Sequence, residues 1–448
     1  MRRSSPRSAR SCRPLARRWR TNSCIVTDPL SIAVCGCGPA GLAAACFLHD
    51  AGHRVRLLER FAEPRPIGAG LMLQPAGLAA LGRIGALDAA LAYGQRIDGL
   101  YARSEPSGRV VFDLSYATVD PALHGLAIHR AAIFEVLWQA AAARRIPVET
   151  GVEIAALAAD AQGRPVPVTT AGRRLPAVDL VVDATGSGSA LRPLARAPVR
   201  PRPYAYGAVW ATVPAAGLRL DRLEQRFRAA REMQGLLPVG RVPGDDVPRA
   251  ILFWSLRVAE HPALVAAGIG AWRRRVLDLW PEIEPVIAGI ADPAQLTLAR
   301  YAQATLRRPF GDRIAFIGDA AHSTSPQLGA GVTMAMLDGA ALADALAAAP
   351  DIPTALAAYA ARRRRHVRFY QRMSALLTPA FQSDSGWIGT LRDLTFHPST
   401  RLPWLRRRMV ETFAGLALGP FAGTHPGALA GMPSTTSGKA SDELRIIR

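Results

Sequence analysis

Lysine is nearly absent from this 448-residue chain: Lys439 is the only one, so 54 of the 55 basic residues are arginines. The formal net charge of +20 would suit a nucleic-acid-binding protein. Such a protein, however, needs a concentrated basic face with stacking aromatics or a known binding motif. Aromatic residues make up only 6% of the chain, and no such motif occurs. We therefore predict no nucleic-acid partner and attribute the arginine excess to compositional bias.

Long apolar runs and a disulfide framework are also missing. No uninterrupted hydrophobic stretch reaches the roughly 20 residues that a membrane span requires. The sequence offers no clear set of disulfide partners, which fits a reducing cytoplasm. We interpret the Cys35-Gly-Cys37 pair as small apolar residues in a tight turn and predict no metal site. The five cysteines are Cys12, Cys24, Cys35, Cys37 and Cys46.

The two ends of the chain are expected to lie outside the fold. Residues 1–27 are rich in arginine and serine and contain no acidic residue. This composition is typical of a transit peptide. We interpret it instead as a disordered extension from a start codon placed too far upstream, and the sequence does not decide whether these residues are expressed. Residues 423–448 are likewise expected to be a disordered tail.

A strand, a glycine turn and a helix follow one another near the start of the chain. The apolar run Leu30–Cys35 predicts a strand buried on both faces, and Pro39–Asp50 predicts a helix. Between them lies the spacing Gly36-x-Gly38-x-x-Gly41. The first glycine permits a sharp turn, the second lets the backbone approach a pyrophosphate, and the third lets helix and strand pack closely. The helix N-terminus supplies free N–H groups for the phosphates.

Glu59 ends the second strand of this unit, 18 residues after Gly41. A carboxylate at this place accepts hydrogen bonds from the ribose hydroxyls, which suits the unphosphorylated adenosine of FAD or NAD. The glycine pattern alone occurs by chance, but its position between a strand and a helix favours a dinucleotide site. The pattern by itself does not distinguish FAD from NAD.

The chain is long enough for two sub-domains. Strand-and-glycine-turn segments open the chain and return near residue 306, whereas 197–305 has more aromatics and the alternation of half-buried strands. We predict an α/β protein: a Rossmann-like dinucleotide-binding domain with a parallel central sheet, an inserted mixed β-sheet domain and C-terminal helices. The expected boundaries are 28–196 and 306–378 for the binding domain, 197–305 for the insertion and 379–422 for the C-terminal helical segment.

A second glycine turn lies far along the chain, in GDAAHSTSPQLGAG at residues 318–331. Small residues fill most of this stretch, which indicates a backbone that lies directly against a ligand. Together with the first turn, it resembles the signatures of the flavoprotein aromatic hydroxylases, the single-component FAD monooxygenases of the p-hydroxybenzoate hydroxylase type. The resemblance covers roughly residues 30–375. Its residues in this second segment are Gly318, Asp319, Ala320, Ala321, His322, Pro326, Gly329, Gly331 and Asp338.

The resemblance implies FAD as the cofactor and a role for several residues. Asp319 would accept hydrogen bonds from ribityl hydroxyls, and Pro326 would line the flavin ring. The backbone N–H groups after Gly329 and Gly331 would face the ring edge that becomes anionic on reduction. Arg130, which opens a predicted helix, would lie near the FAD pyrophosphate.

Other residues of the pattern are assigned differently. His322 receives a structural role beside the second turn rather than that of a general base. Thr185 stands where the family has an aspartate, in a segment linked to both FAD and the nicotinamide donor, although Arg192 is retained. The choice between NADH and NADPH therefore stays open. Thr333 stands where asparagine is usual, and Gln74 is expected near the flavin.

The resemblance implies an FAD-dependent monooxygenase. NAD(P)H would reduce the flavin, oxygen would add at C4a, and the hydroperoxide would hydroxylate or epoxidise an apolar, aromatic or prenylated small molecule. No catalytic side chain is assigned. The inserted sheet would cover the substrate, with Tyr206, Trp210 and Phe253 as candidates to line the pocket.

Two other functions stay open on the sequence. An FAD-dependent dehydrogenase or reductase would act without oxygen insertion, and Thr185 is compatible with it. A non-catalytic flavoprotein accessory would bind FAD without forming an oxygen adduct. A flavin halogenase is excluded, because its catalytic lysine has no counterpart in a chain whose one lysine is in the expected tail.

The C-terminal stretch 377–416 resembles the tail of the ubiquinone-biosynthesis hydroxylases, which act near membranes. The cluster Arg406–Arg408 beside Trp404 would suit an anionic lipid surface, which is compatible with peripheral association with the inner face of a membrane. A helix packed on the binding domain with solvated arginines is an equal alternative. Arg362–Arg365 is interpreted as an exposed helix face. The sequence does not determine the oligomeric state.

Overall fold

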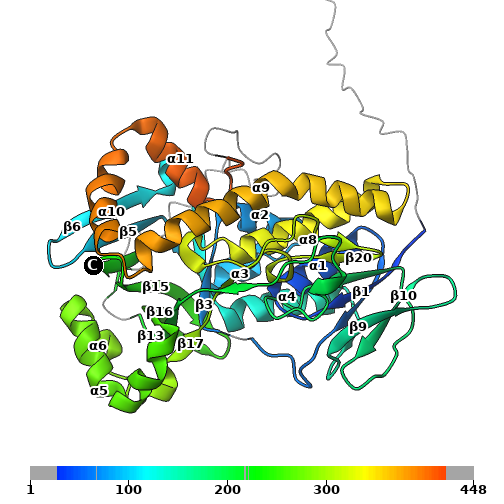
Figure 1. The fold of residues 1–448 in the computed structure, drawn as a ribbon, viewed down its shortest axis with the longest axis horizontal. Helices are drawn as coiled ribbons and strands as arrows, with labels where there is room; N and C mark the ends of the chain where they lie inside the picture. Colours follow the sequence, from blue (N-terminus) through cyan, green and yellow to red (C-terminus); the bar gives the residue numbers. More distant parts are fainter. Residues whose placement is uncertain (1–27, 67, 216–217, 220, 420–448) are drawn as a thin grey trace, which may run out of the picture.

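The structure is a computed structural model that describes residues 28–419 apart from 67, 216–217 and 220, so the expected extension 1–27 and tail 423–448 lie outside the described residues. One half is built on a six-stranded sheet, parallel throughout except for the pair β19–β20 (Figure 1). Its central strands are continuous apolar runs, because both faces of the sheet are covered. The strands in order are β19 (Phe310–Gly311), β20 (Ile314–Phe316), β11 (Leu180–Asp183), β1 (Ser31–Cys35), β2 (Arg54–Leu58) and β8 (Val148–Glu149).

Helices α1 (Pro39–Asp50) and α8 (Gly331–Ala348) pack against each other and share the core on one face of this sheet. They approach closely because Gly339 has no side chain: a Cβ there would lie 2.9 Å from Ala44 Cα. Strand β9 contributes Ile154 to the core on the other face. The other elements of this half are α2 (Pro75–Arg83), α3 (Leu87–Tyr93), α4 (Arg130–Ala143), β9 (Ile154–Ala159), β10 (Pro165–Thr169), η2 (Arg192–Leu194), α7 (Asp319–His322), η6 (Pro326–Leu328) and α9 (Ile352–Phe381).

The second sheet has seven strands, all antiparallel to their neighbours except for the parallel pair β14–β5. Five strands come from the expected insertion 197–305, but two come from residues 99–115, within the expected binding domain. Gly99 permits this arrangement, because a Cβ there would lie 2.4 Å from the Leu114 carbonyl oxygen. The strands in order are β17 (Thr297–Ala299), β13 (Tyr206–Pro214), β16 (Asp245–Arg257), β15 (Glu232–Val242), β14 (Arg222–Arg228), β5 (Gly99–Ser104) and β6 (Arg109–Ser115).

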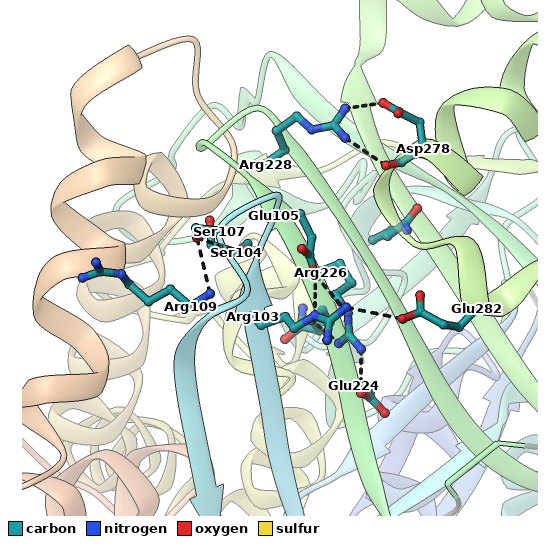
Figure 2. Close-up of polar contacts among 12 residues, drawn as sticks. Arg103, Ser104, Glu105, Ser107, Arg109, Glu224, Arg226, Arg228, Asp278 and Glu282 are labelled. Atoms are coloured by element: carbon teal, nitrogen blue, oxygen red, sulfur yellow. Dashed lines mark hydrogen bonds and ion pairs between the residues drawn. The ribbon is translucent and has the colours of Figure 1, made fainter.

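Ion pairs reinforce the parallel pair where the two parts of the sheet join. Figure 2 shows Arg226 of β14 near Glu224 and Glu105. The Arg226 side chain is 6% exposed and donates to Glu224 at 2.9 Å, while its guanidinium lies 4.1 Å from the Trp280 ring centroid. A charge this deeply buried is tolerated only with partners at close range. Of these contacts, the one with Glu105 links β14 to the end of β5.

Helices and short strands complete the second half and join it to the first. Helix α5 (His261–Leu279) packs on the second sheet through Trp272 and Val276. Two further helices follow α9 at one corner of the molecule, beside β5 and β6 (Figure 1). The remaining elements are the sheet β3 (Gly70–Leu73), β7 (Gly125–His129) and β4 (Gln95–Ile97), the pair β12 (Arg202–Pro203) and β18 (Ala302–Gln303), and helices α6 (Glu284–Ile287), α10 (Gly386–Ser399) and α11 (Pro403–Phe413).

Two helices differ from simple expectation. By length and composition, α8 is apolar enough to cross a membrane, but 67% of it is buried inside the protein, as in the core helix of a globular domain. In α9, the expectation that Arg362–Arg365 is an exposed face is wrong for Arg363, which is 2% exposed. Its guanidinium donates to Asp338 at 2.6 Å, so the charge is balanced inside the core.

Candidate active site

A cavity of about 620 Å³ lies at the carboxyl ends of β1, β2 and β11. Gly36, Gly38 and Glu59 line it, so the structure brings these predicted residues together. In open parallel sheets, ligands bind outside the carboxyl ends of the strands. The N-terminus of α1 opens at the cavity and carries no side-chain cap, which leaves N–H groups available to an anion.

The three glycines of the first turn meet different surroundings. Gly36 has a φ of +100°, and a Cβ there would lie 2.8 Å from the Ala184 carbonyl oxygen. A Cβ at Gly41 would lie 1.8 Å from the carbonyl oxygen of Gly36 itself. At Gly38 a Cβ would meet no atom within 4 Å. Gly36 and Gly41 therefore serve the packing of the turn, whereas only Gly38 leaves open space beside the backbone.

Glu59 is held in place by the backbone around it. Its Oε2 accepts a hydrogen bond from Cys37 N at 2.7 Å, and its Oε1 accepts one from Phe61 N at 3.1 Å. The residue is only 7% exposed, yet it lines the cavity. Each carboxylate oxygen has further lone pairs, so the group can accept hydroxyl protons from a ligand.

A second cavity, of about 300 Å³, lies between the second glycine turn and the second sheet. Pro326 and Gly329 line it on the side of the turn. Arg130, Asp319 and Gly331 line both this cavity and the larger one. The two cavities therefore meet at these residues, and one elongated ligand could occupy both. The helix α8 begins at this junction without a side-chain cap, so it also presents free N–H groups.

Two opposite charges face each other at the junction. Asp319 lines both cavities, although protein atoms surround it on the other sides. Burial raises the pKa of its carboxyl group, and the charges of His322, Arg130 and Arg192 act in the opposite direction. Burial lowers the pKa of the Arg130 guanidinium, while Asp319 raises it. The Arg130 side chain makes no hydrogen bond or ion pair with any of the described residues. A desolvated cation in this state is suited to an anionic ligand.

A buried network holds the second turn from behind. Asp338 of α8 accepts hydrogen bonds from Gly318 N at 2.9 Å and from Arg363 Nε at 2.6 Å, and its Oδ2 lies 2.5 Å from His322 Nε2. Burial alone would raise the pKa of Asp338, but His322 and Arg363 lower it to about 2. His322 is 6% exposed and lines neither cavity. The imidazole therefore packs behind the turn, in agreement with a structural role.

The segment that carries Thr185 is also tied inward. Asp183 accepts hydrogen bonds from Thr185 N at 3.0 Å and Thr185 Oγ1 at 2.6 Å, and Ser189 Oγ donates to its other oxygen. Arg192 is 5% exposed and donates from Nε to the Ala320 carbonyl oxygen at 3.0 Å. Arg192 thus links this segment to the second turn.

Gln74 and Thr333, which the sequence associated with the flavin, both lie outside the two cavities. Thr333 Oγ1 accepts a hydrogen bond from Gln74 N at 3.1 Å. The side chain of Gln74 is fully buried, accepts from the Tyr116 hydroxyl at 2.5 Å and donates to Leu328 O at 3.4 Å. Neither Gln74 nor Thr333 lines either cavity. The Gln74 side chain therefore supports the second turn directly through Leu328, whereas Thr333 contacts the backbone of Gln74.

Two of the three residues predicted to line the substrate pocket do line the smaller cavity. Trp210 and Phe253 line the smaller cavity, with ring centroids 5.2 Å apart. Tyr206 does not line it; its hydroxyl donates instead to Asp384 at 2.7 Å. Although Tyr206 and Trp210 share a face of β13, the strand runs past the end of the cavity. The structure therefore places Tyr206 outside this cavity, unlike Trp210 and Phe253.

Tyr301 is a lining residue that the sequence did not reveal. Its hydroxyl accepts a hydrogen bond from Trp210 Nε1 at 3.0 Å. Burial raises the pKa of Tyr301 to about 12, so the hydroxyl stays protonated near neutral pH. Because that proton is a donor, it can reach an acceptor on a bound molecule. Tyr301 stands in no motif, and only its contact with Trp210 identifies it.

The described residues include no group of three or more histidine, cysteine or acidic side chains arranged to hold a metal ion. The features present suit a dinucleotide instead: an open backbone at Gly38, two uncapped helix N-termini and the unpaired Arg130 around joined cavities. Together these residues fit FAD: the N-terminus of α1 and Arg130 could bind its phosphates, and Glu59 could accept protons from its ribose hydroxyls.

Comparisons with known proteins agree with this fit. A family model described as FAD binding domain matches residues 30–373, which contain both glycine turns. The 3-amino-4-hydroxybenzoate 2-monooxygenase of Streptomyces cremeus is 28% identical over 404 residues, covering 86% of this chain and 96% of that protein. An FAD-dependent urate hydroxylase of Klebsiella pneumoniae is 27% identical over 353 residues, covering 75% and 86%.

Solved structures show the same fold. The crystal structure of Klebsiella pneumoniae HpxO complexed with FAD and uric acid matches with a TM-score of 0.73 at 23% identity, over 87% of this chain and 98% of that chain. The tetrameric form of 2-methyl-3-hydroxypyridine-5-carboxylic acid oxygenase matches with a TM-score of 0.68 at 23% identity, over 84% and 94%. The match to the family model ends before α10 and α11, so the resemblance of that segment stays a prediction.

Proposed function

Because this chain belongs to the FAD-binding domain family, we propose that it is an FAD-dependent monooxygenase that acts on an uncharged, apolar aromatic molecule with O2 and NAD(P)H. The main structural support for this function is that the two cavities meet at Arg130, Asp319 and Gly331. A flavin held across it would place its ring in the smaller cavity. Curated relatives that cover most of the chain are named monooxygenases or hydroxylases.

The residues that would hold FAD follow from their places along the two cavities. Glu59 would accept the ribose hydroxyls, and the N-terminus of α1 would bind the phosphates. Arg130 would pair with the pyrophosphate, which accounts for a half-buried guanidinium without a hydrogen-bond or ion-pair partner among the described residues. Asp319 would accept the ribityl hydroxyls, and the turn Pro326–Gly331 would lie along the ring. When bound, FAD supplies the redox and oxygen chemistry.

The protein's own part is to bind and orient the substrate and to exclude water. The smaller cavity is lined by apolar side chains such as Leu223, Met233 and Phe253. Among its described lining residues, the only charged ones are Arg130 and Asp319, both at the junction with the larger cavity. A substrate carboxylate would find no free counter-charge deeper in the cavity and would lose its hydration. We therefore assign an uncharged substrate.

Tyr301 is the group best placed to orient that substrate. Its hydroxyl is fixed by Trp210 and keeps its proton, so it would donate a hydrogen bond to a substrate oxygen. Gln225 and Gln382 also line the cavity and can donate or accept. The cavity thus recognises polar atoms through neutral groups.

Neither alternative function is favoured over oxygen insertion. The two relatives described above are named for oxygen insertion, as a monooxygenase and a hydroxylase, and neither is named as a dehydrogenase or as a non-catalytic protein. We propose the cytoplasm as the location. One structural relative is described as tetrameric.

The test begins with the purified protein. Flavin absorbance and the identity of the released cofactor establish FAD binding. Uncharged phenols and their carboxylated counterparts are then compared for stimulation of NAD(P)H oxidation, oxygen uptake and formation of a hydroxylated product. We expect coupled product formation with uncharged compounds only. Turnover without oxygen incorporation, or a preference for the carboxylated compounds, would overturn the proposal.

A further inference from the structure

Helix α10 turns its charged residues toward the protein. Arg392 is 1% exposed, donates from Nη1 to the Ala380 carbonyl oxygen at 2.8 Å and lies 4.6 Å from the Phe227 ring centroid. Asp393 accepts hydrogen bonds from Arg392 Nε at 2.8 Å and from Ser104 Oγ of β5 at 2.5 Å. These contacts fix which face of the helix meets the sheet.

The opposite face of α10 is apolar and points to solvent. Trp387, Leu391 and Leu394 are 67%, 49% and 51% exposed and follow the spacing of one helix face. Surface helices of globular proteins have the reverse arrangement, with the apolar face inward. The end of α9 and the start of α11 lie at the same corner of the molecule as α10 (Figure 1). We call six residues the apolar patch: Leu376 of α9, Trp387, Leu391 and Leu394 of α10, and Leu402 and Trp404 at the start of α11.

The apolar patch stands out from the rest of the described surface. The described residues include ten large apolar side chains that are exposed, and six of them lie between residues 376 and 404. Scattered exposed apolar residues need no explanation, whereas a group of them marks an interaction site. The other four are spread over the chain, at Leu91, Leu194, Val247 and Val265.

Positive charge accompanies the apolar patch. Arg372, Arg401 and Arg406 are exposed. Figure 2 also shows Arg109 of β6, the strand packed on α10, extending toward the helix. The three acidic residues of the segment 372–413 are already paired: Asp384 with Arg257, Asp393 with Arg392, and Glu411 with Arg407 and Arg408. The segment therefore offers exposed arginines with no free carboxylate of its own.

We propose that the apolar patch docks this protein on the surface of an anionic phospholipid bilayer. The tryptophan and leucine side chains would enter the interface, and the arginines would contact the headgroup phosphates. A second copy of the chain is a poorer occupant. A two-fold contact would place the patch against itself and bring the same arginines together without carboxylates to pair them. Charge complementarity thus selects the lipid surface.

Docking would also bring the substrate cavity close to the bilayer. Phe381 at the end of α9 and Phe413 at the end of α11 line that cavity, and the same helices carry the apolar patch. Uncharged apolar compounds concentrate in the lipid phase. Delivery of substrate from the bilayer rests on the proposed function, whereas docking itself does not.

The test measures vesicle binding by the FAD-loaded full chain. Sucrose-loaded vesicles of phosphatidylcholine alone, or with about a third phosphatidylglycerol, are sedimented with the protein in low and high salt. We expect binding to the anionic vesicles, at least tenfold weaker for Trp387→Ser/Leu391→Ser and for Arg401→Gln/Arg406→Gln. The matched control, Val247→Ser/Val265→Ser, removes equally exposed apolar side chains elsewhere and should bind like the wild type.

Each outcome decides the proposal. Flavin content and NAD(P)H oxidation of the variants show that they are folded, and these readouts test the function separately from docking. Equal binding by wild type and patch variants, or no binding to anionic vesicles, would overturn the lipid assignment. Sedimentation velocity tests whether a second copy of the chain binds the apolar patch instead. A dimeric wild type with monomeric patch variants, and no vesicle binding, would show that the patch is a dimer interface.

Discussion

At the scale of single residues, two glycines of the first turn are needed for different reasons: Gly41 for the packing of the protein and Gly38 for space beside a ligand. Gly38→Ala adds a methyl group that meets no protein atom within 4 Å, so we expect an unchanged melting temperature without cofactor. Its methyl group would enter the space beside the bound phosphates, and FAD affinity should fall at least tenfold. Flavin titration and thermal melts measure the two effects. A variant with full affinity would contradict the placement of the phosphates at Gly38.

Gly41→Ala should behave in the opposite way. Its methyl group would lie 1.8 Å from the Gly36 carbonyl oxygen, which is backbone and cannot simply move aside. We expect a loss of roughly 3 kcal/mol in the free energy of unfolding even without cofactor, as for other overpacked interiors. Urea denaturation of the cofactor-free protein measures it. A stability equal to that of Gly38→Ala would show that the turn is not packed as described.

The buried network behind the second turn predicts a pH dependence of stability. The pKa of Asp338 falls from 3.8 to about 2 in the fold, so its contribution is complete above pH 3.8 and is lost as pH falls toward 2. Burial disfavours the charged form of His322, but Asp338 raises the pKa of the imidazole above its usual 6.5. The stability that charged His322 contributes is therefore complete below pH 6.5 and is lost as the pH rises through the pKa of His322 in the folded protein. When urea denaturation is repeated across a range of pH, His322→Gln should abolish the loss of stability that the wild type shows as the pH rises. An unaltered alkaline limb in this variant would count against the pairing.

At the scale of elements, helix α10 depends on a close approach to the second sheet. A Cβ at Gly389 would lie 2.6 Å from the backbone carbon of Ala229, whereas one at Gly386 would meet nothing within 4 Å. Gly389→Ala should therefore push the helix outward, at a cost of about 1–3 kcal/mol, and expose the connection 382–385 to proteases. Gly386→Ala is the matched control and should be neutral. Limited proteolysis and thermal melts distinguish them, and equal digestion of both variants would contradict the packing.

At the scale of the whole molecule, one cofactor is expected to join two segments that are nearly 300 residues apart in the sequence. FAD at a hundredfold excess over its dissociation constant should stabilise the protein by about 2.7 kcal/mol. ADP reaches only the larger cavity and riboflavin only the smaller one, so each should bind far more weakly than FAD. Isothermal titration and thermal shifts compare the three. Equal affinity for ADP and FAD would show that the second turn contributes no contact.

The sequence alone determined the features that rest on local geometry. The turn around Gly36, the helix that begins at Arg130 and the second turn at Gly318–Gly331 are readable because each depends on residues close in the chain. The family match confirms the predicted flavoprotein family, and the α/β fold class is confirmed as well. The individual cofactor contacts remain predictions that the placement of these residues supports.

Only the tertiary structure decided which distant surfaces meet. Residues 99–115 join the second sheet through pairing with β14, more than a hundred residues away, and no local pattern encodes such a partner. Tyr206 points to Asp384 rather than into the cavity, and Arg363 is buried because Asp338 lies opposite it. Periodicity tells which side chains share a face of an element. What that face packs against depends on long-range burial and charge pairing, which exist only once the chain has folded.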